Sequence, residues 1–393
     1  MYPSLYYAVK DLFGFDFPFL KMIQSFGFFV ALAFLIAAYF ISQELKRKEN
    51  EGLLNTEKTK TLIGEKATSL ELTTSAIIGF LLGYKLVFIA LHFTDFTENT
   101  QGFILSTQGN FIGGLIGGIL SAYLKFKEKD KEKLPTPIWK ENIVHPYQHV
   151  GNITLIAAVT GLLGAKIFHN LENWDTFIAD PIGELLSFSG LTMYGGLICA
   201  SFACIYYGKK HGIKTTHLID ACAPSLMLSY AIGRIGCHVA GDGDWGINNT
   251  HPKPSWLSWA PDWVWSYDYA HNVLSEGVPI EGCIGSRYCM HLVPSVYPTA
   301  FYETVMCIIL FFVLWNIRKK ITTPGVLFCI YLIFNGIERF FIEKIRVNTL
   351  YHVNHFGFTQ AELISTILFF LGVAGIWYFK KLDRSVQIID RVN

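Results

Sequence analysis

The chain has 393 residues, of which 51% are hydrophobic and 16% charged, whereas soluble proteins carry roughly 25% charged residues. This composition excludes an ordinary soluble domain and is typical of a polytopic membrane protein. The formal net charge of +1 excludes a broad basic surface, so we expect no nucleic-acid partner.

Apolar runs long enough to cross a bilayer recur along the chain. A hydrocarbon core of about 30 Å requires about 20 apolar residues per helix. The runs predict an all-α protein with nine transmembrane helices, near residues 20–42, 73–93, 110–124, 150–170, 188–207, 217–240, 299–317, 324–343 and 359–379. The third, sixth and eighth are the least typical, because they are short, interrupted by glycine or charged at one end. The first run is too long for a cleaved signal peptide.

Basic residues alternate between the two sides of this arrangement. Lysine and arginine concentrate after the first, third, fifth, seventh and ninth runs, whereas 94–109 and 171–187 hold none, and 241–298 holds only Lys253 and Arg287. The positive-inside rule therefore predicts an N-terminus outside and a C-terminus in the cytoplasm. We divide the chain into a first helix with its loop, an extra helix pair, core helices, an outer head and C-terminal core helices, at residues 1–72, 73–147, 148–240, 241–298 and 299–393.

The predicted outer head is rich in tryptophan and holds two cysteines. Its tryptophans are Trp245, Trp256, Trp259, Trp263 and Trp265. They indicate either a membrane-interface belt or a peptide-binding surface. Cys283 and Cys289 lie in the same segment, where an oxidising compartment can pair them.

An internal similarity links two helix pairs. Lys85 in GFLLGYKLVF precedes GGLIGG at Gly113 by 28 residues, and Lys166 in GLLGAKIF precedes GGLICA at Gly195 by 29. We interpret residues 73–127 as a degenerate duplicate of 155–210. The alternative is chance similarity between glycine-rich helices, which pack closely in lipid in any case.

Three clusters of polar or ionisable residues lie at the ends of apolar runs. Such groups are costly in hydrocarbon and usually face a protein interior or a water-filled cavity. They are Arg234 in IGRIGCHVAGDGDWG, the face formed by Arg339, Glu343 and Arg346, and the stretch Tyr194-Gly195-Gly196. The predicted topology brings all three toward the outer leaflet.

Two arginines at headgroup depth, each near a carboxylate, indicate a site for an anionic lipid headgroup. Arginine offers a planar fork of donors that matches phosphate. In the alternative interpretation, Arg234 and Arg339 only pair with Asp242 and Glu343 and extend toward the interface.

These segments resemble the prolipoprotein diacylglyceryl transferase family. GRIGCHVAGD is similar to its signature G-R-x-G-N-F-x-N-G-E, and FIADPIGELLSFSGLTMYGGL resembles the segment that leads to its His-Gly-Gly motif. YPTAFYE, which includes Tyr302, is similar to its Pro-Ser-Gln-x-Tyr-Glu motif, and GIERFFIEKIR to its F-R-x-x-x-E-x-x-R helix. The motifs recur in order from about residue 20 to 380, with the pair 73–127 as an addition.

The resemblance implies a lipid-transfer reaction in the bacterial inner membrane. The lipobox cysteine of a prelipoprotein signal peptide attacks the glyceryl carbon of phosphatidylglycerol next to the phosphate, a thioether forms and glycerol phosphate leaves. It further implies that Arg234 contacts the phosphate, that Arg339 is a second essential arginine, and that Glu343 and Asp242 are the associated carboxylates. Gly195, Gly196, Arg346 and Tyr302 are expected to bind substrate. No metal or organic cofactor is implied.

The chain departs from the family pattern where the base is expected. Tyr194 stands in place of the motif histidine, and a phenol with a pKa of about 10 is a poor base at neutral pH. The alternatives for the base are His238, Asp242 and Glu343. In a further alternative, the arginines alone lower the pKa of the substrate thiol. Lys166 matches a basic position and is either a third phosphate contact or a lysine that extends to the interface.

Two other classes of function are compatible with parts of this pattern. A transporter also combines duplicated helix pairs with buried charges, but the first copy lacks an arginine or carboxylate partner. A non-catalytic lipid-binding paralogue is compatible with Tyr194 and with Cys237, which stands where the signature has asparagine. Turnover separates it from the enzyme.

Overall fold

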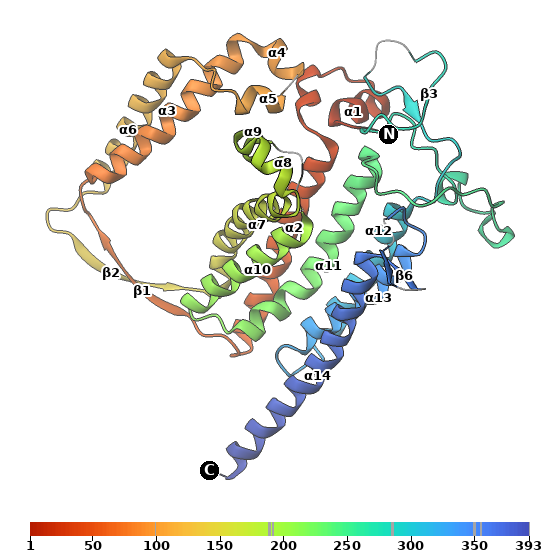
Figure 1. Cartoon of the computed structure of the whole chain (residues 1–393). Coiled ribbons are helices and arrows are strands. Elements are labelled where there is room, and N and C mark those ends of the chain that lie inside the picture. The colour runs from red at the N-terminus through yellow and green to blue at the C-terminus, as the bar shows by residue number, and fades with distance from the viewer. Residues whose placement is uncertain are drawn as a thin grey trace. The chain divides into compact units, whose positions relative to one another are not determined.

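The structure is a computed structural model that describes residues 1–98, 100–187, 190, 192–283, 287–348, 351–353 and 356–392. Helices predominate, and three two-stranded sheets occur among these residues. Contacts divide the chain into two compact units. Unit 1 comprises Met1–Asn55, Pro146–Ala158 and Phe202–Asn393, and unit 2 comprises Thr56–His145 and Val159–Ser201; the α-helices of both are labelled in Figure 1.

Unit 1 contains most of the long helices. Its elements are α1 Leu5–Phe13, η1 Pro18–Met22, α2 Ser25–Asn50, η2 Pro146–His149, α11 Thr215–Ala240, η3 Ser255–Leu257, η4 Asp262–Val264, β3 Val278–Pro279, β4 Met290–His291, α12 Thr299–Ile317, α13 Val326–Glu343, β5 Tyr351–Val353, β6 Phe356–Phe358 and α14 Gln360–Val392. Two helices, α7 Val150–Glu172 and α10 Met193–Lys210, run from one unit into the other.

Unit 2 contains the additional helix pair and a strand ribbon. Its elements are β1 Glu57–Ile63, α3 Ser69–Leu91, α4 Phe93–Glu98, α5 Thr100–Leu105, α6 Phe111–Glu132, β2 Ile138–Val144, α8 Trp174–Ala179 and α9 Pro181–Leu186. Thr68 and Glu71 form a capping box that starts α3, and the Asn110 side chain caps α6.

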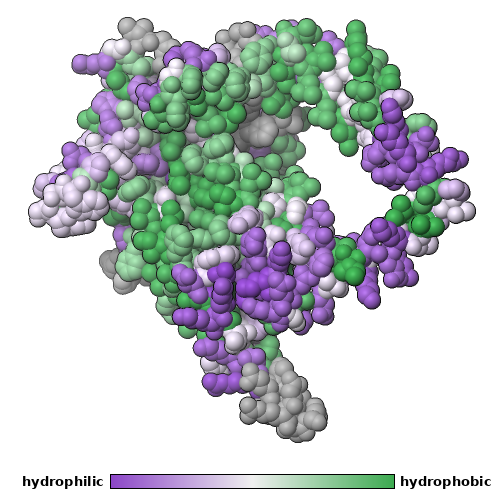
Figure 2. Space-filling model, turned by 180° about the vertical axis from the view of Figure 1, so that it is seen from behind, coloured by the Kyte–Doolittle hydropathy of each residue, from purple (hydrophilic) through white to green (hydrophobic). Residues whose placement is uncertain are grey.

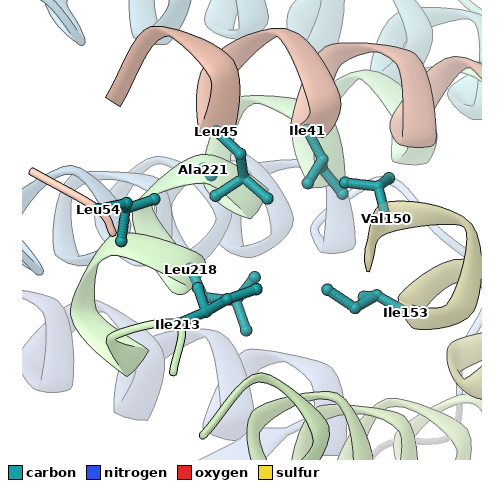
Figure 3. Packing of buried hydrophobic residues seen from close by; sticks show 8 residues of the cluster. All are labelled: Ile41, Leu45, Leu54, Val150, Ile153, Ile213, Leu218 and Ala221. Carbon is teal, nitrogen blue, oxygen red and sulfur yellow. The ribbon is translucent and has the colours of Figure 1, made fainter. Parts of the chain in front are cut away.

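Helix α11 is the centre of unit 1. It packs against α2, α12 and α13, and α13 packs in turn against α14. Figure 3 shows one of its cores, where Ile41 and Leu45 of α2 meet Val150 of α7 and Leu218 of α11. Small residues such as Ala221 let these helices approach closely, which is how helices associate in lipid.

A second core joins the three helices that carry the charged motifs. Met227 and Ala231 of α11 pack with Cys307 and Phe311 of α12 and with Leu327 of α13. Each of these side chains is almost fully buried. The ends of α11, α12 and α13 are therefore held in register by dispersion contacts along their length.

Two helix pairs of unit 2 pack through corresponding glycines. A Cβ atom at Gly83 would collide with the carbonyl of Gly113, and one at Gly164 would collide with the carbonyl of Gly195. These are the glycines that the internal similarity pairs. The close packing agrees with a duplicated pair, and the duplication itself stays a prediction.

Helices lie over all nine apolar runs, and six of the helices in the described residues are long and apolar enough to cross a membrane. The six are α2, α3, α7 with η2, α11, α12 and α14. The other three helices are less hydrophobic, because they contain charged, glycine or tyrosine residues; they are α6, α10 and α13. A multi-pass helical membrane protein is confirmed, while nine spans remain a prediction. The outer surfaces of the helices are largely hydrophobic, as Figure 2 shows on one face.

Strands β1 and β2 are the main element that the sequence did not predict. They pair antiparallel, from Glu57 with Val144 to Ile63 with Ile138, inside segments expected to be charged loops. Both strands contain β-branched or aromatic residues, among them Thr59, Thr61, Trp139 and Ile143, which suit a two-stranded ribbon. Their partners lie far apart in sequence, so the local pattern gave no indication of pairing.

Segment 241–298 has a small core of its own, formed by Trp245, Tyr269 and Val296. Cys283 and Cys289 form a disulfide, as the sequence allowed. The exposed tryptophans include Trp256 and Trp259.

Candidate functional site

Arg234 lies near the end of α11 and is only 8% exposed. Its Nη1 atom pairs with Asp244 and its Nε atom with Glu303 of α12. Its Nη2 atom donates to the hydroxyl of Tyr230, one turn earlier, at 3.1 Å. The arginine is therefore held at three nitrogens inside the protein.

Glu303 is the centre of the site. It lies one turn into α12, on the buried face that also carries Thr299 and Cys307, and it is fully buried. Its carboxylate accepts from Arg346 Nη1 at 3.0 Å and from Arg339 Nη1 at 3.4 Å, in addition to the pair with Arg234.

The hydroxyl of Tyr230 donates to the second carboxylate oxygen of Glu303 at 2.9 Å. One buried carboxylate thus meets three guanidinium groups and a phenol. A carboxylate at 0% exposure requires such partners, because an unpaired charge in a low-dielectric interior is very costly.

The motif on α13 forms the other side of the site. Arg339 pairs with Glu343 at 3.3 Å, which confirms that the two residues share a helix face. Glu343 also accepts from the side-chain amide of Asn348 at 2.5 Å. Arg346 follows the helix and pairs with both Glu303 and Asp244.

We call the ion-paired set the arginine cluster. It comprises Arg234, Arg339, Arg346, Asp244, Glu303 and Glu343. The predicted convergence of the signature arginine with the α13 motif is therefore found within unit 1.

Asp244 and Asp242 differ from the expected pairing. The carboxylate that pairs with Arg234 belongs to Asp244, not to Asp242 as the alternative interpretation supposed. Burial opposes ionisation of Asp244, but Arg234 and Arg346 outweigh it and lower the pKa of Asp244 to about 2. Asp242 accepts a weak hydrogen bond from the Asp244 amide at 3.4 Å, and burial together with the neighbouring Asp244 raises the pKa of Asp242.

His238 and Tyr302 lie against segment 241–298. The His238 ring contacts the rings of Trp263, Tyr267 and Phe301, and its Nδ1 atom lies 3.1 Å from the Tyr269 hydroxyl. Tyr302 donates its hydroxyl to the carbonyl of Val264 at 2.8 Å. Both side chains have packing and hydrogen-bonding roles here, which favours a structural function for His238.

The remaining candidates belong to unit 2, which the structure describes separately from the arginine cluster. Gly195 and Gly196 lie in the first turn of α10 and pack against Phe168 and Gly161 of α7. Lys166 is 8% exposed and lies 3.7 Å from Glu184. Tyr194 is half-buried at the start of α10. Participation of these residues in a headgroup site stays a prediction.

Sequence reasoning missed several members of the site. Glu303, Asp244 and Tyr230 were not singled out, although an acidic residue inside an apolar run is itself a signal. Glu338 was also missed; it is 4% exposed, and neither carboxylate oxygen has a hydrogen-bond partner among the described residues. Their partners became visible only when α11, α12 and α13 were placed together.

One group near the site has the ligand types that metals use. Cys237, Asp242 and Asp244 offer a thiol and two carboxylates within 4.8 Å of one another in the described residues. Asp244 is already engaged by two guanidinium groups. Both oxygens of Asp244 are therefore held by cations, which opposes metal binding at this group.

Comparison with known proteins gives a consistent picture. The family model described as prolipoprotein diacylglyceryl transferase matches residues 133–378, more than half of the chain. This range holds every candidate site residue and leaves out the helix pair at 73–127.

Three relatives carry the name phosphatidylglycerol-prolipoprotein diacylglyceryl transferase. The chain is 27% identical over 243 residues to the protein of Dehalococcoides mccartyi, covering 61% of this chain and 81% of the relative. It is 26% identical over 269 residues to that of Streptococcus sanguinis, covering 67% and 87%. It is 25% identical over 328 residues to that of Leptospira interrogans, covering 70% and 90%.

Proposed function

Because the chain belongs to the prolipoprotein diacylglyceryl transferase family, we propose that it transfers the diacylglyceryl group of phosphatidylglycerol to the lipobox cysteine of prelipoproteins. In this reaction the cysteine sulfur forms a bond to the glyceryl carbon, and the bond from that carbon to the phosphate oxygen breaks. The products are a thioether-linked lipoprotein precursor and glycerol phosphate. The family assignment favours this transferase over a transporter or a non-catalytic paralogue.

The arginine cluster is the observation that carries the proposal. Arg234 of α11, Arg339 of α13 and Arg346 just after α13 converge on one buried carboxylate, Glu303. Several fixed guanidinium groups at the end of membrane helices match the phosphate of an anionic lipid in charge and geometry. Arg234 and Arg346 would hold the phosphate, while Arg339 and Glu343 position the cluster from α13.

Fixed cations also suit the chemistry of the step. A free thiol has a pKa of about 8.5, and a nearby positive charge favours the thiolate, which is the nucleophile. The same arginines stabilise the negative charge that develops on the departing phosphate, without reorganisation at the moment of reaction.

We favour Asp242 as the acceptor of the thiol proton. Burial and Asp244 raise the pKa of the Asp242 carboxyl, and a carboxylate with a raised pKa is a better general base. Glu343 is already paired with Arg339, and His238 is enclosed by aromatic rings.

The membrane arrangement is part of the proposal. Nine spans place the lysine-rich connections in the cytoplasm and segment 241–298, with its exposed tryptophans, on the outer face of the bacterial inner membrane. The arginine cluster then lies near the outer leaflet, where secreted precursors present their lipobox cysteines. The helix pair at 73–127 would be an addition to the family core.

The experiment that tests the proposal is a transfer assay with purified protein, phosphatidylglycerol and a lipobox peptide, read by peptide mass and by released glycerol phosphate. Wild type is expected to form both products, and Arg234→Ala to lose at least about 100-fold in rate. Arg287→Ala, which changes an exposed arginine outside the cluster, serves as the matched control. Absence of product from wild type with several peptides would refute the proposal.

A further inference from the structure

Asp244 makes contacts that resemble those of a bound phosphate. One carboxylate oxygen, Oδ2, pairs with Nη1 of Arg234, and the other, Oδ1, pairs with Nη2 of Arg346. Two oxygens of one anion thus bridge two arginines from different elements. The two non-bridging oxygens of a phosphodiester present the same pattern of acceptors.

We propose that the Asp244 carboxylate occupies the position of the lipid phosphate between Arg234 and Arg346, and that the headgroup binds by displacing it. The inference rests on the proposed function, because it takes an anionic phospholipid as the ligand. It makes Asp244 a specificity-determining residue, since only a ligand that replaces both arginine contacts can compete with it.

The charges of the cluster balance only while Asp244 is bound. Three arginines form its ion pairs, and three carboxylates, those of Asp244, Glu303 and Glu343, oppose them. Removal of one carboxylate leaves one uncompensated positive charge. A phosphodiester carries one negative charge and restores the balance, whereas binding beside an undisplaced Asp244 would bring two anions together.

Of the two carboxylates that bind both Arg234 and Arg346, Asp244 is the one whose side chain can move away from the arginines. Its side chain is 31% exposed, whereas that of Glu303, the other acid bound to Arg234 and Arg346, is 0% exposed. Asp244 also lies in a short loop after α11 and follows Gly241 and Gly243, whose φ values are 63° and 95°. Glu303 is fixed in the body of α12.

The backbone around Asp244 is anchored, so displacement requires only the side chain to rotate. The Thr299 hydroxyl donates to the Asp244 carbonyl at 2.8 Å, and the amide of Gly246 donates to the carbonyl of Tyr297 at 2.8 Å. The loop would therefore keep its place when the headgroup enters. Only those molecules in which the Asp244 side chain has left the arginines can bind the headgroup. The apparent affinity is therefore reduced in proportion to that fraction.

The test is calorimetric titration of short-chain phosphatidylglycerol into the full-length protein in detergent micelles, for wild type, Asp244→Asn and the control Asp262→Asn. Asp262 is 98% exposed and pairs with Lys253 outside the cluster. We expect Asp244→Asn to bind about tenfold more tightly than wild type, and Asp262→Asn to match wild type. Unchanged or weaker binding by Asp244→Asn overturns the inference, since it would mean that the carboxylate only holds the arginines in place.

A second measurement covers the case in which Asp244→Asn does not fold. In wild type, infrared difference spectra on addition of phosphatidylglycerol should show a carboxylate stretch leaving its arginine-bound frequency; no such change would overturn the inference.

The transfer assay separates the two hypotheses. If wild type transfers lipid but Asp244→Asn binds no better, the inference alone fails; tighter binding by Asp244→Asn without transfer by wild type means that the proposed function alone fails.

Discussion

Two clusters of buried charge lie in unit 1, and they differ in how their carboxylates are held. The arginine cluster surrounds Glu303 between α11, α12 and α13. The other, which we call the Glu44–Asp220 cluster, comprises Glu44, Arg47, Lys48, Asp220 and Arg318.

The two buried carboxylates of the Glu44–Asp220 cluster are fixed, and the exposed Glu51, which also pairs with Arg47 at 2.6 Å, lies just after α2. Glu44 accepts from Arg47 at 2.5 Å and from Arg318 at 3.0 Å, and Asp220 accepts from the backbone amides of Gly325 and Phe328 at 2.8 and 3.0 Å. Asp220 thereby caps α13. The arginine cluster instead includes Asp244, a half-exposed acid on a loop. Buried charge alone therefore does not indicate a binding site; a partly exposed acid that bridges two buried arginines does.

The largest effect is expected for stability at Asp220. The change Asp220→Ala removes the cap of α13 and leaves the Lys48 ammonium, 3.8 Å away, without its carboxylate. Loss of one partner of a buried pair costs about 3–5 kcal/mol. Thermal unfolding in detergent should show this loss, whereas Asp262→Ala should leave the transition unchanged. A stable Asp220→Ala protein would remove the distinction between the two clusters.

The next largest effect concerns the proton acceptor. Asp242→Asn should lower the transfer rate by about 100-fold, the lower range for loss of a general base. Since a base must be ionised, the wild-type rate should fall as pH drops through the raised pKa of Asp242. The acidic limb of the pH–rate profile should be absent from the variant. A profile with the same acidic limb in both proteins would assign the base elsewhere.

A smaller effect is expected at Arg346. Arg346 binds Asp244 and Glu303 through two different nitrogens of its planar guanidinium group. The change Arg346→Lys keeps the positive charge but offers only one nitrogen for both carboxylates. Arg346→Lys should raise the KM for phosphatidylglycerol about tenfold, and Arg287→Lys should leave it unchanged. An unchanged KM in Arg346→Lys would show that positive charge alone suffices there, and an equal rise in both variants would show that the effect is not specific to the cluster.

The smallest effect is expected at Tyr194. If the proton acceptor is a carboxylate, Tyr194→Phe should retain the transfer rate within about threefold, since it loses at most one hydrogen bond, worth about 1 kcal/mol. Loss of most activity would make the phenol of Tyr194 a direct participant in the reaction.

The sequence predicted the helices better than their connections. Run length and apolar content are local properties, so helices lie over all nine runs. The ribbon of β1 and β2 depends on pairing between Glu57 and Val144, which no local pattern reveals. Short helices such as α1 were missed for the same reason, since their packing is decided by other parts of the chain.

Part of the candidate site could be predicted from the sequence, and its role in the reaction stays a proposal. Arg234, Arg339, Glu343 and Arg346 were recognised because charges at the ends of apolar runs require partners. The role of Glu303 was not recognised, because one glutamate in an apolar helix does not disclose that three arginines converge on it. Asp244 replaced the expected Asp242 because the conformation of the glycine-rich loop decides which aspartate meets Arg234.

One measurement tests the account most directly: transfer rate and thermal unfolding of Arg234→Lys and Arg318→Lys side by side. Each arginine pairs through Nε with a buried glutamate, Glu303 and Glu44 respectively. Arg234→Lys should lose about 100-fold in rate per folded molecule, whereas Arg318→Lys should keep its rate per folded molecule, and each variant should lose roughly 1–2 kcal/mol of stability. Equal losses of rate in both variants, or a fully active Arg234→Lys, would contradict the assignment of the arginine cluster as the phosphate site.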